Sequence, residues 1–149
     1  MELWAHRGSG KGSLENTIKG FEIALNSGFN AVEFDVMLTA DSVPMIHHDW
    51  VMGRCARSLD PAMAATDPLT RFDSLRVRDL RHYAVQDEPI PSLAQTIAYC
   101  LKHNMRANVE LKATHPANAM ALGQAVKGTV EELPLDQQQH IRKHWVFSS

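Results

Sequence analysis

The chain has 149 residues, of which 44% are hydrophobic and 21% are charged, a composition typical of an ordinary globular domain. Its formal net charge of −2 offers no basic surface for a nucleic acid or an anionic membrane. No apolar run approaches the roughly 18 residues that a membrane-spanning helix needs, and the first residues carry no export signal. Cys55 and Cys100 match no metal or redox spacing, which favours two reduced thiols. We therefore expect one cytoplasmic domain over residues 1–149, with no nucleic-acid partner and no membrane span.

The first predicted element is a short apolar strand that leads to His6, and a loop rich in glycine and serine follows it. This loop contains GSGKG, which resembles a phosphate-binding loop but lacks the spacing of that motif, so a flexible loop is the better interpretation. Apolar residues then recur at helical spacing and predict a helix over residues 16–27. Asn16 can cap the start of this helix, and Gly28 can end it.

The second predicted strand, NAVEFDVML at residues 30–38, places two carboxylates inside an apolar run. Because strand side chains alternate between faces, Phe34 and its apolar neighbours point one way, and Glu33 and Asp35 point the other. An exposed sheet edge would explain one such pair. The strand predicted at 106–112 repeats the alternation with Glu110, which makes an exposed edge a poorer explanation for both.

The connection between the second strand and a third strand, VPMIHH at 43–48, has only about four residues, whereas a parallel crossover needs about a dozen. These two strands are therefore joined tightly, as a hairpin or an abbreviated unit. Residues 49–91 follow as a long excursion over one face of the domain, with a short helical signal near 74–83.

The second half of the chain alternates more regularly between the two kinds of element. A helix begins at Ser92, a fourth strand follows, and residues 116–133 form another helical stretch. After a polar segment the chain ends on a fifth strand, WVFSS, at 145–149. This order of elements indicates an α/β fold with a mostly parallel sheet.

In α/β folds the functional residues gather at the carboxyl ends of the parallel strands and in the loops just beyond them. Here that position holds three carboxylates, up to three imidazoles and two cations: His6, Arg7, Glu33, Asp35, His47, His48, Glu110 and Lys112, with Asp49 beside them. A group of buried carboxylates is tolerable when a cation lies among them. Ligands made only of oxygen suit a hard divalent ion such as Mg²⁺ or Ca²⁺. We therefore predict a metal site.

Several motifs also occur in an order that is familiar from one enzyme family: AHRG with ENT, then VEFDV, VPMIHHD, EPIPSL and ANVELK. From about residue 4 to its end, the chain resembles the glycerophosphodiester phosphodiesterase family, and within it the bacterial cytosolic members. The resemblance implies a TIM (β/α)₈ barrel and one divalent cation. It also implies hydrolysis of glycerophosphodiesters to sn-glycerol 3-phosphate and an alcohol.

The resemblance further implies a role for each residue that matches a family motif. Glu33, Asp35 and Glu110 would hold the metal, and His6 and His48 would form a general acid/base pair. Arg7 and Lys112 would contact the phosphate. Glu15 and Asn16 match the family's ENT, where shaping of the first loop and catalysis are equally good interpretations.

A barrel of this type takes about 250 residues, and this chain covers only about its first five strands. We expect truncation or cleavage in preference to a designed half-barrel, and we expect either self-association or a missing C-terminal half of the barrel. Without that half, the inward faces of Val109, Leu111 and Val146, or of the residues that share their layer, are expected to be exposed. The alternative function is a non-catalytic half-barrel that keeps the site residues and acts as an assembly or phosphate-binding unit.

Overall fold

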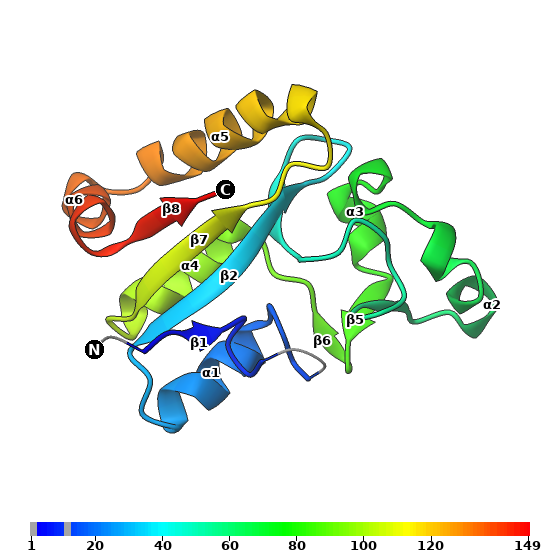
Figure 1. The fold of residues 1–149 in the computed structure, drawn as a ribbon, viewed down its shortest axis with the longest axis horizontal. Helices are drawn as coiled ribbons and strands as arrows, with labels where there is room; N and C mark the ends of the chain where they lie inside the picture. Colours follow the sequence, from blue (N-terminus) through cyan, green and yellow to red (C-terminus); the bar gives the residue numbers. More distant parts are fainter. Residues whose placement is uncertain (1–2, 11–12) are drawn as a thin grey trace.

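A sheet of five strands organises the computed structural model, which describes residues 3–10 and 13–149 (Figure 1). Four strands lie in the order β1-β2-β7-β8 and run parallel, and β3 pairs antiparallel with β2. Their bounds are Ala5–His6 for β1, Ala31–Leu38 for β2, Pro44–Ile46 for β3, Arg106–Leu111 for β7 and Val146–Ser148 for β8. The five predicted strands are thus all present. The antiparallel direction of β3 makes the tight second connection a hairpin.

The apolar face of this sheet packs against the helices. These are α1 (Ile18–Asn26), α4 (Leu93–Lys102), α5 (Pro116–Glu131) and α6 (Leu135–His144). In Figure 1, α4 lies behind β2 and β7, whereas α1 lies beside β1 and α5 beside β8. Phe34 of β2 and Val109 of β7 are fully buried in one core with Ile97 of α4. The expectation that Val109 loses its cover was therefore wrong, because the helices cover this face. Val146 is 49% exposed.

The register of the strands decides which polar residues meet on the other face. Glu33 of β2 lies level with His6 of β1, and Asp35 lies level with Glu110 of β7. Adjacent residues in register on parallel strands point to the same face of the sheet. The two acidic positions of β2 and the one of β7 therefore share the face that the helices leave open.

The boundaries of α1 follow from its ends, and they correct one prediction. Its N-cap is Thr17, whose hydroxyl accepts a hydrogen bond from the backbone of Gly20, so Asn16 does not cap this helix. Asn16 has a left-handed φ of 58°, which turns its side chain to β2 instead. The helix ends at Asn26 with Ser27 as its C-cap, just before Gly28 with its φ of 89°, as predicted.

Residues 49–91 contain a second, smaller sheet, seen to the right of the main sheet in Figure 1. Its strands are β4 (Arg57–Ser58), β5 (Tyr83–Val85) and β6 (Glu88–Pro89), and its helical segments are α2 (Pro61–Ala64), η1 (Asp67–Leu69), η2 (Phe72–Ser74) and α3 (Val77–Leu80). Met52 and Phe72 are almost fully buried in a separate apolar cluster of this lobe. The excursion is thus a folded lobe, and its apolar cluster also includes Met37 of β2 and Met45 of β3.

One predicted polar segment is helical, and one predicted loop lies partly outside the described residues. The polar segment before the last strand forms α6, which is stabilised because Ile141 packs into the main core. The flexible loop predicted for GSGKG includes residues 11 and 12, which lie outside the described residues. Within the described ranges, no helix is long and apolar enough to cross a membrane.

Candidate active site

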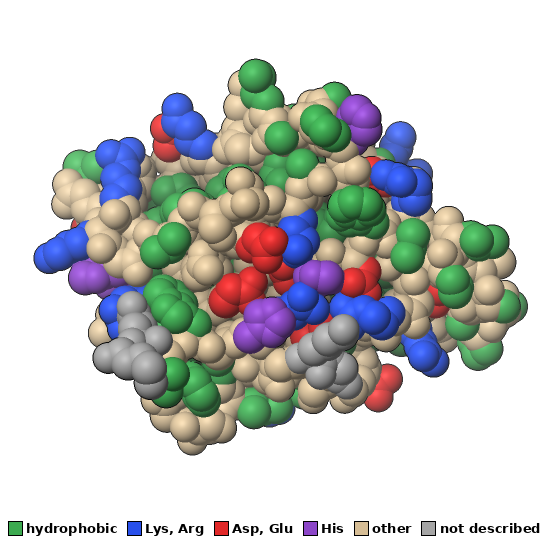
Figure 2. Space-filling view, in the orientation of Figure 1, with side chains coloured by type: hydrophobic (Ala, Val, Ile, Leu, Met, Phe, Trp, Pro, Cys, Tyr) green, Lys and Arg blue, Asp and Glu red, His purple; other side chains and the backbone are tan. Residues whose placement is uncertain are grey.

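Three carboxylates converge on the open face of the main sheet. Glu33, Asp35 and Glu110 each bring an oxygen within 4.8 Å of the other two. Glu33 and Asp35 come from β2, and Glu110 is their neighbour on β7. The predicted ligand group is therefore assembled by strand register alone. Figure 2 shows acidic, basic and histidine side chains gathered at the centre of this face.

The carboxylate of Asp35 is fully buried, and burial raises its pKa from the ordinary value. Its Oδ2 atom accepts a hydrogen bond from Asn16 at 2.8 Å. Its Oδ1 atom, although buried, has no hydrogen-bond partner among the described residues, and the ammonium of Lys112 lies 3.5 Å from it. A buried acceptor left in this state is costly unless a cation binds it. This oxygen therefore fits the role of a metal ligand.

The other two carboxylates of the cluster differ from one another in environment. Burial, and after it the charge of Asp35, raises the pKa of Glu33. A hydrogen bond from Lys112, 2.8 Å from the oxygen of Glu110, lowers the pKa of Glu110. Burial acts to lower the pKa of Lys112, but its hydrogen bond to Glu110 and the charge of Asp35 outweigh burial and raise it. The lysine is thus held as a cation beside the cluster.

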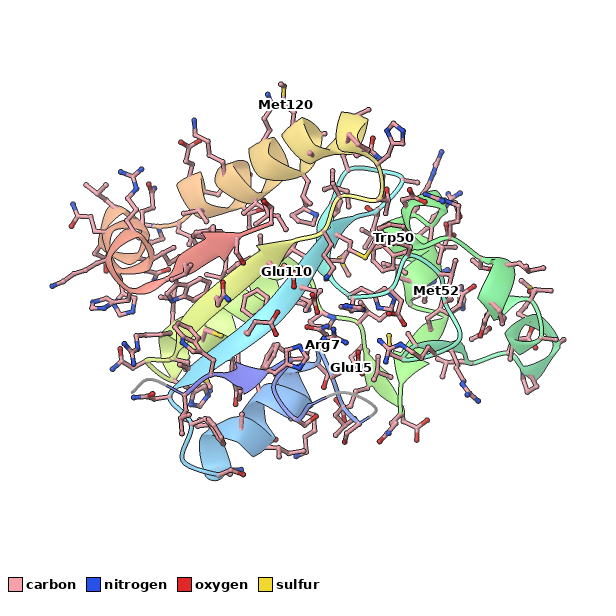
Figure 3. All side chains as sticks on the ribbon, viewed as in Figure 1. Arg7, Glu15, Trp50, Met52, Glu110 and Met120 are labelled. Carbon is pink, nitrogen blue, oxygen red and sulfur yellow. The ribbon has the colours of Figure 1, made fainter. Side chains whose placement is uncertain are left out.

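Arg7 is the second cation at the site, and its guanidinium is nearly buried. Its Nε atom lies 3.3 Å from Asp35 and its Nη1 atom 3.0 Å from Glu15, while its backbone N–H donates to Glu33 at 3.0 Å. Arg7 has a φ of 53°, an uncommon value for a residue with a side chain. In Figure 3, Arg7 and Glu15 lie together below Glu110, beside the 49–91 lobe.

The two predicted acid/base histidines come from two elements, β1 and the segment just past β3, which both pair with the same edge of β2. His6 follows the apolar part of β1, its Nε2 atom is 3.8 Å from Glu33, and its side chain is 60% exposed. His48 follows β3, which returns beside β2 because of the hairpin, and its Nδ1 atom lies 2.6 Å from Asp49. The predicted site residues therefore lie within β2 (Glu33 and Asp35), at or just past the carboxyl ends of β1 and β7, or just past the antiparallel β3.

Sequence reasoning did not find one residue that belongs to this surrounding network. Arg54, in the 49–91 lobe, bonds both Asp49 and the fully buried Glu15. No pattern in the sequence identifies Arg54, because Glu15 lies 39 residues away and Asp49 lies in an irregular loop. For Glu15 and Asn16, the ENT motif was the available signal.

A family model for the glycerophosphoryl diester phosphodiesterase family matches residues 6–142. Among curated proteins, glycerophosphodiester phosphodiesterase 1 of Mus musculus is 31% identical over 134 residues, which cover 87% of this chain and 38% of the mouse protein. Uncharacterized protein YqiK of Bacillus subtilis is 26% identical over 114 residues, which cover 74% of this chain and 45% of YqiK. The chain thus spans less than half the length of these curated relatives.

Solved structures show the same fold. A phosphodiesterase of Oleispira antarctica, solved in complex with the product sn-glycerol-3-phosphate, has a TM-score of 0.77 and 26% identity, covering 91% of this chain and 54% of that one. A glycerophosphodiester phosphodiesterase of Parabacteroides distasonis has a TM-score of 0.73 and 23% identity, covering 98% and 55%. These likenesses confirm the predicted fold class, a TIM (β/α)₈ barrel of which this chain is one part.

Proposed function

Since the chain belongs to the glycerophosphoryl diester phosphodiesterase family, we propose that its site hydrolyses glycerophosphodiesters to sn-glycerol 3-phosphate and an alcohol. The observation that carries this proposal is the convergence of Glu33, Asp35 and Glu110 from two neighbouring strands. The buried Oδ1 atom of Asp35 supports it, because among the described residues it has no hydrogen-bond partner and only the ammonium of Lys112 nearby, at 3.5 Å.

We assign the three carboxylates as ligands of one divalent cation, Mg²⁺ or Ca²⁺, since all the ligand atoms are oxygens. When bound, such an ion would stabilise the charge that develops on the phosphate oxygens. Lys112 and Arg7 would add fixed positive charge for the phosphate. The side chain of Lys112 is 20% exposed and that of Arg7 only 9%, so Lys112 is the more accessible of the two.

His6 and His48 would carry out the two proton transfers of the reaction. One imidazole takes the proton of the attacking hydroxyl, and the other donates a proton to the oxygen of the leaving alcohol. Two separate elements supply them, since His6 ends β1 and His48 follows β3, which runs antiparallel to it along the same edge of β2. Each group is expected to contribute about 10²- to 10⁴-fold to the rate.

The test is turnover of glycerophosphocholine by the purified 149-residue chain, measured as the release of sn-glycerol 3-phosphate. We expect release with Mg²⁺ or Ca²⁺, none with a chelator, and a large loss in Glu33→Gln. Glu22→Gln is the matched control, because Glu22 lies on the surface of α1, where it pairs with Lys19, and the substitution should leave turnover unchanged. A folded, metal-loaded chain without turnover would contradict the proposal.

The alternative is a non-catalytic half-barrel that keeps the site residues and binds phosphate beside the cations Lys112 and Arg7. Calorimetric binding of glycerol 3-phosphate without any turnover of the diester would favour it. Self-association is a related proposal, because Val146 and Phe147 of β8 are 49% and 44% exposed. Light scattering at micromolar concentration tests it, and a stable monomer would contradict it.

A further inference from the structure

His48 and Asp49 form a hydrogen-bonded pair whose proton can be placed. The Nδ1 atom of His48 lies 2.6 Å from Oδ1 of Asp49. Burial alone would raise the pKa of Asp49, but hydrogen bonds from Arg54 and from His48 outweigh it and lower that pKa to about 2. An ionised carboxylate can only accept hydrogen bonds. Nδ1 of His48 therefore carries the proton, and in the neutral ring the Nε2 atom keeps its lone pair.

Arg54 holds the other side of this carboxylate. Its Nη2 atom donates to Oδ1 of Asp49 at 2.9 Å, and its Nε atom donates to Oδ2. The same guanidinium donates to both oxygens of Glu15, at 3.0 and 2.8 Å. Glu15 is fully buried and also accepts from Arg7 at 3.0 Å, and Arg7 contacts Asp35. Charges of alternating sign thus connect Asp35 in the acidic cluster to Asp49.

We propose that Arg54 is a positioning residue for His48: it clamps Asp49 against Nδ1 of that imidazole and is itself anchored on the buried Glu15. The clamp fixes both the tautomer and the orientation of the ring, so that Nε2 is the atom available for proton transfer. The catalytic part of this inference rests on the proposed function. The structural part, which concerns the tautomer, does not.

The planar fork of arginine suits this position better than a lysine would. Two carboxylates are each bound through two N–H groups of a single guanidinium, and an ammonium has no such fixed geometry. Arg54 comes from the 49–91 lobe, whereas Glu15 belongs to the loop after β1. The lobe would therefore contribute to the site by supplying this clamp.

The competing explanation is that Arg54 only ties the lobe to the first loop. That role would affect stability but not the state of the His48 ring. The state of the ring can be read from the ¹⁵N shifts of its two nitrogens under alkaline conditions that leave imidazole neutral. The His48 signals are identified by their loss in His48→Ala.

In the unsubstituted chain we expect a protonated Nδ1 and an unprotonated Nε2. In Arg54→Gln the ¹⁵N shifts of the two nitrogens should move towards the values of the tautomer mixture found in an unrestrained imidazole. Arg54→Lys keeps a positive charge between Glu15 and Asp49, which protects the fold. It should still change the ¹⁵N shifts of His48, because an ammonium lacks the planar set of donors of a guanidinium. Unchanged ¹⁵N shifts in folded Arg54→Lys or Arg54→Gln would overturn the proposal.

Arg71→Gln is the matched control, because Arg71 makes a similar two-bond pair with Asp73 in the same lobe. Loss of that pair should leave the His48 shifts unchanged. Equal shifts in Arg71→Gln and Arg54→Gln would assign the effect to general loosening of the lobe and overturn the proposal.

Turnover supplies a second readout. Arg54→Gln should lower kcat about ten- to a hundredfold, as is common for groups that orient a reacting side chain, with little change in KM. In the Asp49→Asn background the same substitution should cost almost nothing more, whereas independent roles would give additive losses. If the unsubstituted chain shows no turnover, the proposed function fails, and the ¹⁵N shifts alone still decide whether Arg54 positions His48.

Discussion

Asn16 and Asp35 form a reciprocal pair: Nδ2 of Asn16 donates to the carboxylate of Asp35 at 2.8 Å, and the backbone N–H of Asp35 donates to Oδ1 of Asn16 at 3.2 Å. This pair fixes a buried carboxylate from two directions. It also explains why Asn16 has a φ of 58°, since asparagine tolerates left-handed backbone better than most residues. Asn16, which precedes the N-cap of α1, thus orients an acidic group on β2.

Asn16→Ala should lower both stability and metal affinity. The substitution removes both hydrogen bonds between Asn16 and the buried Asp35, and loss of a buried hydrogen-bond partner costs roughly 1–3 kcal/mol, more when the group is charged. Denaturant unfolding measures the first effect, and calorimetric titration with Mg²⁺ or Ca²⁺ measures the second. Asn104→Ala is the control, because Asn104 has a similar φ of 51° but is exposed. Equal losses in the two variants would show that only backbone strain matters at Asn16.

Glu33→Gln should weaken binding of the divalent ion by at least about tenfold, the effect common for groups next to a metal. The backbone N–H of Arg7 can still donate to the amide oxygen of the glutamine, so the fold should survive. Calorimetric titration of the two proteins with Mg²⁺ and with Ca²⁺ measures the change. Glu22→Gln, on the surface of α1, should bind like the unsubstituted chain. Equal affinity in Glu33→Gln would remove Glu33 from the ligand set.

His48→Ala should lower kcat by roughly 10²-fold or more, because the proposed reaction then lacks one of its two proton-transfer groups. His6→Ala should have an effect of the same order. Steady-state turnover of glycerophosphocholine measures both. His82→Ala is the control, since His82 is exposed in the 49–91 lobe. Either variant with a kcat within a few-fold of the unsubstituted chain would exclude that histidine from the mechanism.

Gly8→Ala should destabilise the fold by several kcal/mol, whereas Gly10→Ala should cost only about 1–3 kcal/mol, the usual cost of left-handed backbone in a residue with a side chain. Both glycines have positive φ, 79° and 85°. A Cβ at Gly8 would lie 2.8 Å from a backbone carbon of Gly20 in α1, and a Cβ at Gly10 would meet nothing within 4 Å. Thermal unfolding of the two variants separates strain from collision. Equal destabilisation would show that the contact with α1 is relieved by a small shift.

The sequence predicted the five strands and three of the longer helices because each has a simple period or a clear end signal. The alternation of β2 placed Glu33 and Asp35 on one face, and the repeated alternation of β7 brought Glu110 to them. Local patterns suffice when the site is built by strand register. They also suffice at the start of α4, where Ser92 and Gln95 form a capping box.

Other features depend on contacts that no local pattern shows. The polar surface of α6 hides its helical character, and only burial of Ile141 in the core holds it in place. Asn16 carries a good capping side chain, but its bond to Asp35 outcompetes the cap and leaves that role to Thr17. Arg54 joins the site through a lobe whose fold the sequence does not predict. These positions are decided by tertiary structure.

The buried His47 leads to a prediction about pH. Its ring is 1% exposed and stacks on Phe72 with centroids 4.7 Å apart. Burial lowers the pKa of His47 from 6.5 to about 4. Below pH 6.5, His47 is therefore protonated in the unfolded chain but stays neutral in the folded chain, so the free energy of unfolding should fall as the pH decreases towards 4.

The expected loss between these pH values is about 3 kcal/mol, since each unit of pKa difference corresponds to roughly 1.4 kcal/mol. Urea unfolding at a series of pH values measures it, and His47→Gln should flatten the curve in this window. The exposed His82→Gln should keep the full slope. The low pKa of Asp49, about 2, acts in a lower window: its contribution is present above the ordinary value of 3.8 and is lost below it. A slope that persists unchanged in His47→Gln would show that another group titrates between pH 6.5 and 4, and that His47 is not held neutral by its burial.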